Sequence, residues 1–168
     1  MTEDDYLDEI AALWPKLNEP QVFAELVRLV DEAIQQCGPS AGLLCVKGDL
    51  VRLAPADMRF LPSDEPADYY RKALEIDPRC WEAWEELGYC YDIDCAFDMA
   101  IDAFRHSIAL GGGANSFYGL ARCLAQRGDK SEALQTVSQA LASCGSAEDA
   151  QELRQLKDEI ERGIWDPT

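Results

Sequence analysis

A pattern of large and small residues recurs along the chain after 33 residues. The first copy consists of Trp84, Leu87, Gly88, Tyr91, Ala100 and Phe104, and the second of Phe117, Leu120, Ala121, Leu124, Ala133 and Val137. Periods of this length occur in proteins built from stacked helix pairs, because one pair cannot bury its apolar face alone and needs neighbours. The repeat therefore predicts an all-α fold before any single helix is assigned.

The second half of this unit occurs a third time upstream. Tyr70, Ala73 and Leu74 stand 34 residues before Phe104, Ser107 and Ile108. The spacing from Trp84 to Phe104, Trp-x2-Leu-Gly-x2-Tyr followed by Ala-x3-Phe, resembles the tetratricopeptide repeat (TPR), and the resemblance covers residues 64–142. It implies an α-α superhelix of helix hairpins whose concave groove, lined by the first helix of each pair, holds a peptide or helix of another protein.

The length suits one domain over residues 1–168, within which we expect five segments. They are a leading helix pair (1–37), an irregular repeat with an insertion (41–77), two regular repeats (81–110 and 114–142), and a capping helix with a tail (146–168). Pro55 and Pro62 bracket the insertion, so that either Gly48 or Ala54 could occupy the small-residue position of the irregular repeat.

The last segment has the pattern of a terminal cap. Leu153, Leu156 and Ile160 form one apolar stripe on an otherwise polar helix, as the end of a stack of repeats requires. Gly163 ends this helix, and we expect Ile164–Pro167 to fold back onto the stripe.

Net charge limits the possible partners. The chain has 32 Asp and Glu against 15 Lys and Arg, a formal charge of -17, which repels phosphate backbones and anionic lipid headgroups. Nucleic acid and membrane are therefore not expected as partners. The chain shows no signal-peptide pattern and no run of 18 apolar residues, and its seven cysteines include no Cys-x-x-Cys pair, so we expect a cytoplasmic protein with reduced thiols.

Residues able to do chemistry are scattered. Cys90 and Cys95 enclose two aspartates and could suggest a metal site, but Cys90 recurs as Cys123, which indicates buried packing equivalents and no metal. His106 is the only histidine and is expected to face outward. The run Gly111–Gly113 lacks the lysine of a phosphate-binding loop and indicates a joint between repeats. We therefore predict no catalytic residue, no cofactor and no enzymatic activity.

Helical spacing also predicts which residues would line the groove, opposite the face turned toward the core. They are Glu82, Glu85, Tyr89 and Asp92 in the first regular repeat, and Asn115, Tyr118, Arg122 and Gln126 in the second. The alternative is that these residues form an ordinary solvated surface. TPR proteins that hold chaperone C-termini carry cations on this face, where Glu82 and Glu85 stand here. The predicted partner is therefore a basic or mixed basic-apolar segment of another protein.

These patterns favour a non-enzymatic TPR adaptor that binds a partner in an acidic concave groove. A second hypothesis is a dedicated chaperone or immunity-type protein that sequesters one cognate protein. A third, from another class, is a hydrolase or metal-dependent enzyme that uses surface carboxylates. The oligomeric state is left open by the sequence.

Overall fold

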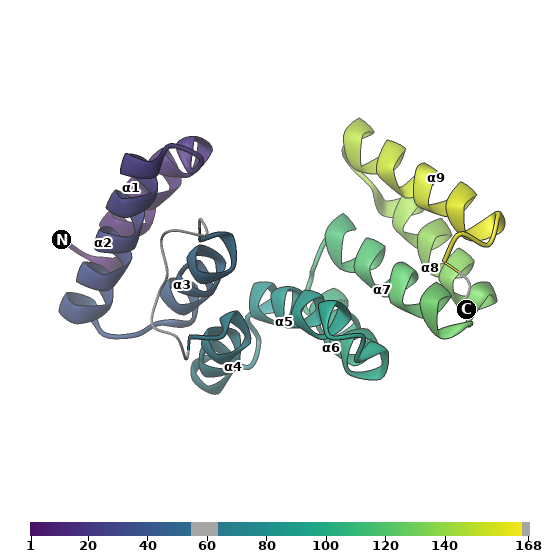
Figure 1. Cartoon of the computed structure of the whole chain (residues 1–168), viewed down its shortest axis with the longest axis horizontal. Coiled ribbons are helices and arrows are strands. Elements are labelled where there is room, and N and C mark those ends of the chain that lie inside the picture. The colour runs from purple at the N-terminus through teal and green to yellow at the C-terminus, as the bar shows by residue number, and fades with distance from the viewer. Residues whose placement is uncertain (55–63, 166–168) are drawn as a thin grey trace. The chain divides into compact units, whose positions relative to one another are not determined.

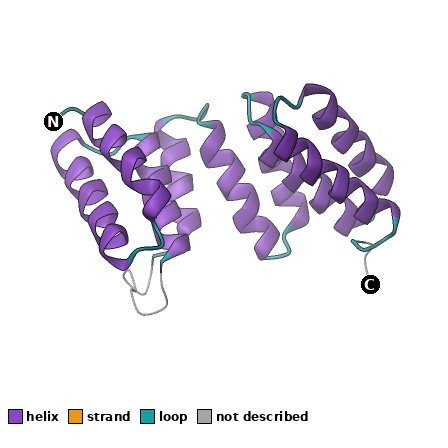
Figure 2. Ribbon diagram, turned by 90° about the horizontal axis from the view of Figure 1, so that it is seen from above, coloured by secondary structure: helices purple, strands orange, loops and turns teal. Residues whose placement is uncertain are grey.

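The computed structural model describes residues 1–54 and 64–165, and these ranges contain helices and no strand (Figures 1 and 2). The helices are α1 (Glu3–Leu13), the short 3-10 helix η1 (Trp14–Lys16), α2 (Pro20–Cys37), α3 (Ala41–Leu53), α4 (Pro66–Ile76), α5 (Trp81–Ile93), α6 (Phe97–Ala109), α7 (Ala114–Arg127), α8 (Lys130–Ser143) and α9 (Ala147–Glu161). The predicted all-α class is confirmed. Most of the predicted insertion and the end of the tail lie outside the described residues.

The chain divides into two compact units, Met1–Cys80 and Trp81–Thr168. Each unit has its own apolar core. The boundary falls in the short connection between α4 and α5.

In the first unit, polar side chains fix where the helices begin. Thr2 and Asp5 form a capping box at the start of α1, in which each side chain accepts a hydrogen bond from the other residue's backbone N–H, at 3.3 and 2.7 Å. Ser40 caps α3 by accepting from the N–H of Leu43 at 3.2 Å. The core between α1, α2 and α3 contains Tyr6, Ile10, Phe23, Leu26, Leu29, Val30, Ala33, Leu43 and Leu50.

The irregular repeat forms a hairpin of α3 and α4, with Gly48 as its small residue. A Cβ atom on Gly48 would lie 2.6 Å from Cε1 of Tyr70, so no larger side chain fits without moving the ring. Ala54, the other candidate, caps the end of α3. The tyrosine also donates a hydrogen bond from its hydroxyl to Oδ1 of Asp49 at 2.7 Å.

In the second unit, Phe104 of α6 lies between two glycines. A Cβ atom on Gly88 of α5 would lie 2.8 Å from the Phe104 ring, and one on Gly119 of α7 would lie 2.3 Å from it. Gly88 therefore occupies the predicted crossing point of two helices. The ring is fully buried and joins the first regular hairpin to the second.

The predicted cap is confirmed. Ser146 begins α9 by accepting from the N–H groups of Glu148 and Asp149, and Leu153, Leu156 and Ile160 are buried. Trp165 folds back against the core that contains these residues and donates from Nε1 to Glu159 at 3.0 Å. The predicted return of the tail is thus seen as far as this tryptophan, and the following residues lie outside the described ranges.

Two residues of the regular repeat are less buried than the repeat pattern indicates. Trp84 is only half-buried, and its ring stacks on that of the exposed His106 with centroids 4.5 Å apart. The prediction that Cys90 and Cys123 are buried equivalents is wrong, because Cys123 is buried while Cys90 is half-buried. Position 90 turns partly outward, although both cysteines follow the same repeat spacing.

Candidate partner-binding surfaces

The predicted groove residues of α5 fall into two groups. Glu82 is exposed and Tyr89 is half-buried. Glu85 and Asp92, by contrast, are only 8% and 9% exposed. The prediction that both carboxylates project from an open acidic face is therefore wrong, and their charges lie inside the second unit.

Glu85 is buried because α7 supplies it with a hydrogen-bond donor. The hydroxyl of Ser116 donates to Oε2 of Glu85 and lies 2.9 Å from the hydroxyl of Ser107 on α6. Ser107 in turn donates to the backbone oxygen of Trp81 at 2.9 Å. A chain of polar side chains thus connects α5, α6 and α7, and the carboxylate is an internal structural group.

Asp92 is buried because it pairs with a cation on α7. Arg122 forms an ion pair with Oδ2 of Asp92, and the thiol of Cys123 donates to Oδ1 at 3.3 Å. The guanidinium also lies 5.9 Å from the ring centre of Tyr118 and 6.0 Å from that of Trp165, within reach of a cation–π attraction. Its Nε atom is buried and has no hydrogen-bond partner among the residues that the structure describes.

Burial around this ion pair changes the acidity of nearby groups. Desolvation, reinforced by the charge of Asp92, raises the pKa of the Cys123 thiol well above its ordinary value. Desolvation and the nearby Glu85 likewise raise the pKa of the Tyr89 hydroxyl, which donates to the backbone oxygen of Asn115 at 2.9 Å. Both groups are neutral at physiological pH and serve as hydrogen-bond donors.

The remaining predicted residues lie on α7 at different depths. Asn115 is exposed, and Tyr118 and Gln126 are half-buried. Glu82 and these three residues are thus accessible to a partner, and their role in binding stays a prediction. Sequence periodicity identified the shared face but could not show that two of its acids are paired with α7.

The raised pKa of Cys123 predicts a slow thiol. Because the thiolate is the reactive form and the sulfur is buried, we expect iodoacetamide to modify Cys123 at least about 10-fold more slowly than the exposed Cys37 and Cys95. Mass spectrometry of timed samples of the folded protein would measure the three rates. Equal rates for Cys123 and Cys95 would contradict the buried position, and in urea the differences should disappear.

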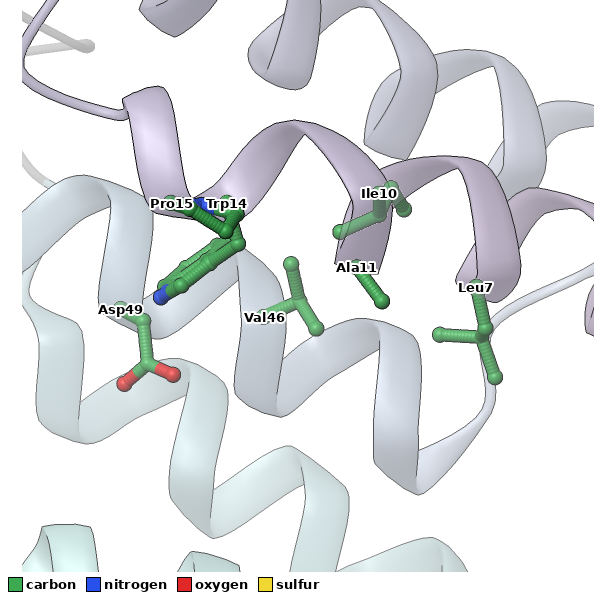
Figure 3. A pocket seen from close by; sticks show the side chains of 7 residues that line it. All are labelled: Leu7, Ile10, Ala11, Trp14, Pro15, Val46 and Asp49. Atoms are coloured by element: carbon green, nitrogen blue, oxygen red, sulfur yellow. The ribbon is translucent and has the colours of Figure 1, made fainter.

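An apolar pocket of about 550 Å³ opens on the first unit, between α1, η1 and α3 (Figure 3). It is lined by Leu7, Ile10, Ala11, Trp14, Pro15, Val46 and Asp49. Trp14 and Asp49 lie toward one end of the pocket and Leu7 toward the other, with Val46 between them. Apart from the Asp49 carboxylate and the Trp14 indole N–H, the lining side chains are apolar.

Helical spacing explains how these residues meet. Leu7, Ala11 and Trp14 follow one another at intervals of four and three residues, so that they share one side of α1 and η1. Val46 and Asp49 are three apart on α3 and face the same space. The two helices therefore present their apolar sides to a common hollow.

Asp49 gives the pocket a fixed carboxylate. Its Oδ1 accepts a hydrogen bond from Tyr70 at 2.7 Å and lies 3.6 Å from the guanidinium of Arg52. Burial raises the pKa of the Asp49 carboxyl, against the opposing effects of these two neighbours. A cation brought beside it would stabilise the ionised form.

The helix that supplies one wall of the pocket is acidic. Helix α1 carries five acids and no lysine or arginine. Among them, Asp4 and Asp8 are exposed and lie on the same line along the helix as Ala11. The apolar lining thus lies along a helix that is strongly acidic elsewhere on its surface. Sequence reasoning missed the pocket, although the apolar residues of an otherwise acidic helix were a usable signal.

Two other classes of site are absent from the described part of the chain. No group of three or more His, Cys, Asp or Glu side chains there could hold a metal ion. Within the same residues, no helix combines the length and the apolar character needed to cross a bilayer.

Comparison with known proteins supports the fold. Two crystal structures of MamA match the chain with a TM-score of 0.62 each. One is 20% identical, with 89% of this chain and 88% of the other covered, and the second is 19% identical, with 96% and 87% covered. At this identity the similarity shows the fold alone. No family model and no curated protein sequence matches the chain, so membership of the TPR family stays a prediction.

Proposed function

We propose that this chain is a non-enzymatic protein-interaction module that binds a basic-apolar segment of a partner in the pocket between α1, η1 and α3. The proposal depends on the pocket itself, which has a volume of about 550 Å³, is open to solvent and has a mostly apolar lining. Pockets of about 300–1,000 Å³ commonly hold ligands, so this one has room for a large apolar side chain.

Charge selects the kind of segment. Helix α1, which supplies one wall of the pocket, carries five acids, Asp49 lies at one end of the apolar lining beside Arg52, and the chain as a whole carries -17. A partner that inserts a large aliphatic or aromatic side chain and places Lys or Arg beside it would match both features. Complementary charge of this kind speeds association and excludes acidic competitors.

We assign a secondary role in partner binding to the predicted groove on α5 and α7. Glu85 and Asp92 are buried, whereas Glu82 is the exposed acid of the predicted set on α5. Tyr118 and Asn115 supply polar and aromatic contact area on α7. We therefore assign charge selection to the first unit and expect the α5 and α7 face to add contacts.

A dedicated chaperone or immunity-type protein would use the same surfaces but differ in selectivity. It would hold one cognate protein tightly, whereas an adaptor would accept several segments that share the basic-apolar pattern. A catalytic role would need a group that reacts, and the pocket offers one carboxylate whose neighbours are structural. Binding is therefore the function that this geometry supports best.

The proposal is tested with peptides of known sequence. Selection of a displayed random peptide library on the intact protein should enrich sequences with a large apolar residue next to Lys or Arg. We expect Ala11→Lys to weaken binding of a selected peptide at least about 10-fold, because the new side chain fills the pocket and carries the same charge as the partner. Fluorescence anisotropy with a labelled peptide measures the dissociation constant.

Ala12→Lys is the matched control. Ala12 is the next residue of α1, is exposed as Ala11 is, and does not line the pocket. The Ala12→Lys substitution adds the same charge to the same helix, so this variant should weaken peptide binding only slightly and only at low salt. Asp49→Asn keeps an acceptor for Tyr70 and should reduce the salt dependence. Equal affinities for both lysine variants, or enrichment of acidic peptides, would overturn the proposal.

A further inference from the structure

Two thiols from separate elements meet in the first unit. The sulfur atoms of Cys45, within α3, and Cys80, in the connection that follows α4, lie 3.7 Å apart. They are 35 positions apart in sequence, so the fold brings them together. This separation is van der Waals contact for two sulfur atoms and lies about 1.7 Å beyond the disulfide bond length of about 2.05 Å.

The turn after α4 holds Cys80 in this position. The backbone oxygen of Asp77 accepts from the N–H of Cys80 at 3.1 Å, and its side chain accepts from the N–H of Arg79 at 2.9 Å. Asp77 itself ends α4 by donating to the oxygen of Ala73 at 2.8 Å. Cys80 thus lies in a short hydrogen-bonded turn outside any helix. Its backbone can shift there more readily than that of a helical residue such as Cys45.

The two thiols differ in accessibility. Cys45 is only 7% exposed, whereas Cys80 is half-buried and can be reached from solvent. In reactive dithiols, an accessible thiol that meets the oxidant and a sheltered neighbour that resolves the product form the usual division of roles. The geometry matches this arrangement.

We propose that Cys45 and Cys80 form a dithiol site that reacts with peroxides and closes to a reversible disulfide. The thiolate of Cys80 attacks one oxygen of hydrogen peroxide, which forms a sulfenic acid and releases the other oxygen as water. The thiol of Cys45 then attacks that sulfur, so that the S–S bond forms and a second water leaves. Two thiols are oxidised and one peroxide is reduced to two waters.

The bond would tie the first half of α3 to the end of the α3–α4 hairpin. It closes a loop between positions 45 and 80 and should restrict the unfolded chain, so the oxidised protein should melt at a higher temperature than the reduced one. Val46, the next residue of α3, lines the apolar pocket. The proposal stands independently of what that pocket binds.

The experiment treats the full chain with limited hydrogen peroxide and maps its peptides by mass spectrometry. We expect a cross-linked peptide containing Cys45 and Cys80, lighter by two hydrogen atoms, about 2 Da, and cleaved by dithiothreitol. Phenylarsine oxide is an independent probe, since one arsenic atom should bind both sulfurs with loss of one water and block their alkylation together. Circular dichroism confirms that each variant is folded.

Cys80→Ser should abolish both the cross-link and the arsenical adduct, and so should Cys45→Ala. Cys95→Ser is the matched control, because Cys95 is exposed and lies in the second unit, and this variant should behave as the parent does. Oxidation of Cys80 to a sulfinic acid while Cys45 stays reduced would overturn the proposal. Arsenical capture that persists in folded Cys80→Ser would overturn it as well.

Discussion

Replacing Phe104 with alanine is expected to lower the free energy of unfolding by about 3–5 kcal/mol. The ring is fully buried between Gly88 and Gly119 and forms a T-shaped pair with the ring of Tyr89, with centroids 4.9 Å apart. Its removal leaves a cavity between the two regular hairpins that neither glycine can fill. Urea denaturation of the parent and of Phe104→Ala, followed by circular dichroism, measures the difference.

A small-to-large substitution of the facing glycine tests the same contact. Gly88→Leu should cost about 1–3 kcal/mol in the parent, because its Cβ atom alone would lie 2.8 Å from the ring of Phe104. In Phe104→Ala the same leucine should cost less or even stabilise, since it enters the vacated space. Additive effects of the two changes would mean that the residues do not share a contact.

Gly42→Ala is the matched control for these glycine changes. Gly42 lies in α3, and a Cβ atom there would meet nothing within 4 Å. Alanine at this position should stabilise the chain by about 0.4–1 kcal/mol, because it restricts the unfolded state without a clash. A loss of stability at Gly42 as large as that at Gly88 would point to a general intolerance of substitution.

Asp92→Ala is expected to destabilise the chain by about 3–5 kcal/mol. The substitution leaves Arg122 without its ion-pair partner in a partly buried site and removes the acceptor of the Cys123 thiol. Replacing both members of the pair, with Asp92→Leu and Arg122→Met, should recover much of the loss because no unpaired charge remains. Urea titration of the three proteins provides the comparison.

Asp98→Ala is the control for Asp92→Ala. Asp98 also pairs with an arginine, Arg127, at 2.7 Å, but its side chain is 84% exposed. Removal of such a surface pair should change stability by about 0–1 kcal/mol. If both alanine variants lose the same small amount, then Asp92 is solvated after all and belongs to an open acidic face.

The helices and their order were predictable because their signals are local and periodic. The capping stripe of Leu153, Leu156 and Ile160 and the small residue Gly88 could be identified from spacing alone. For the irregular repeat, spacing left Gly48 and Ala54 equally possible. The choice depends on where Tyr70 lies across the hairpin, which local periodicity does not specify.

The candidate surfaces were harder to predict. A carboxylate on a helix is usually solvated, so spacing placed Glu85 and Asp92 on the open face. Their burial depends on donors from α7, Ser116 for one and Arg122 for the other. The apolar pocket arises similarly, where residues of α1 and α3 that are distant in sequence face one hollow.

The position of Phe104 between two glycines limits how a chain like this can evolve by gain or loss of repeats. Gly88 belongs to the hairpin of Phe104, whereas Gly119 belongs to the next one. A repeat inserted between α6 and α7 must therefore bring its own small residue to face the ring, and a deleted repeat must leave one behind. A duplicated segment fits only if it begins and ends at the same position of the repeat. The array can therefore lengthen or shorten only by whole repeats.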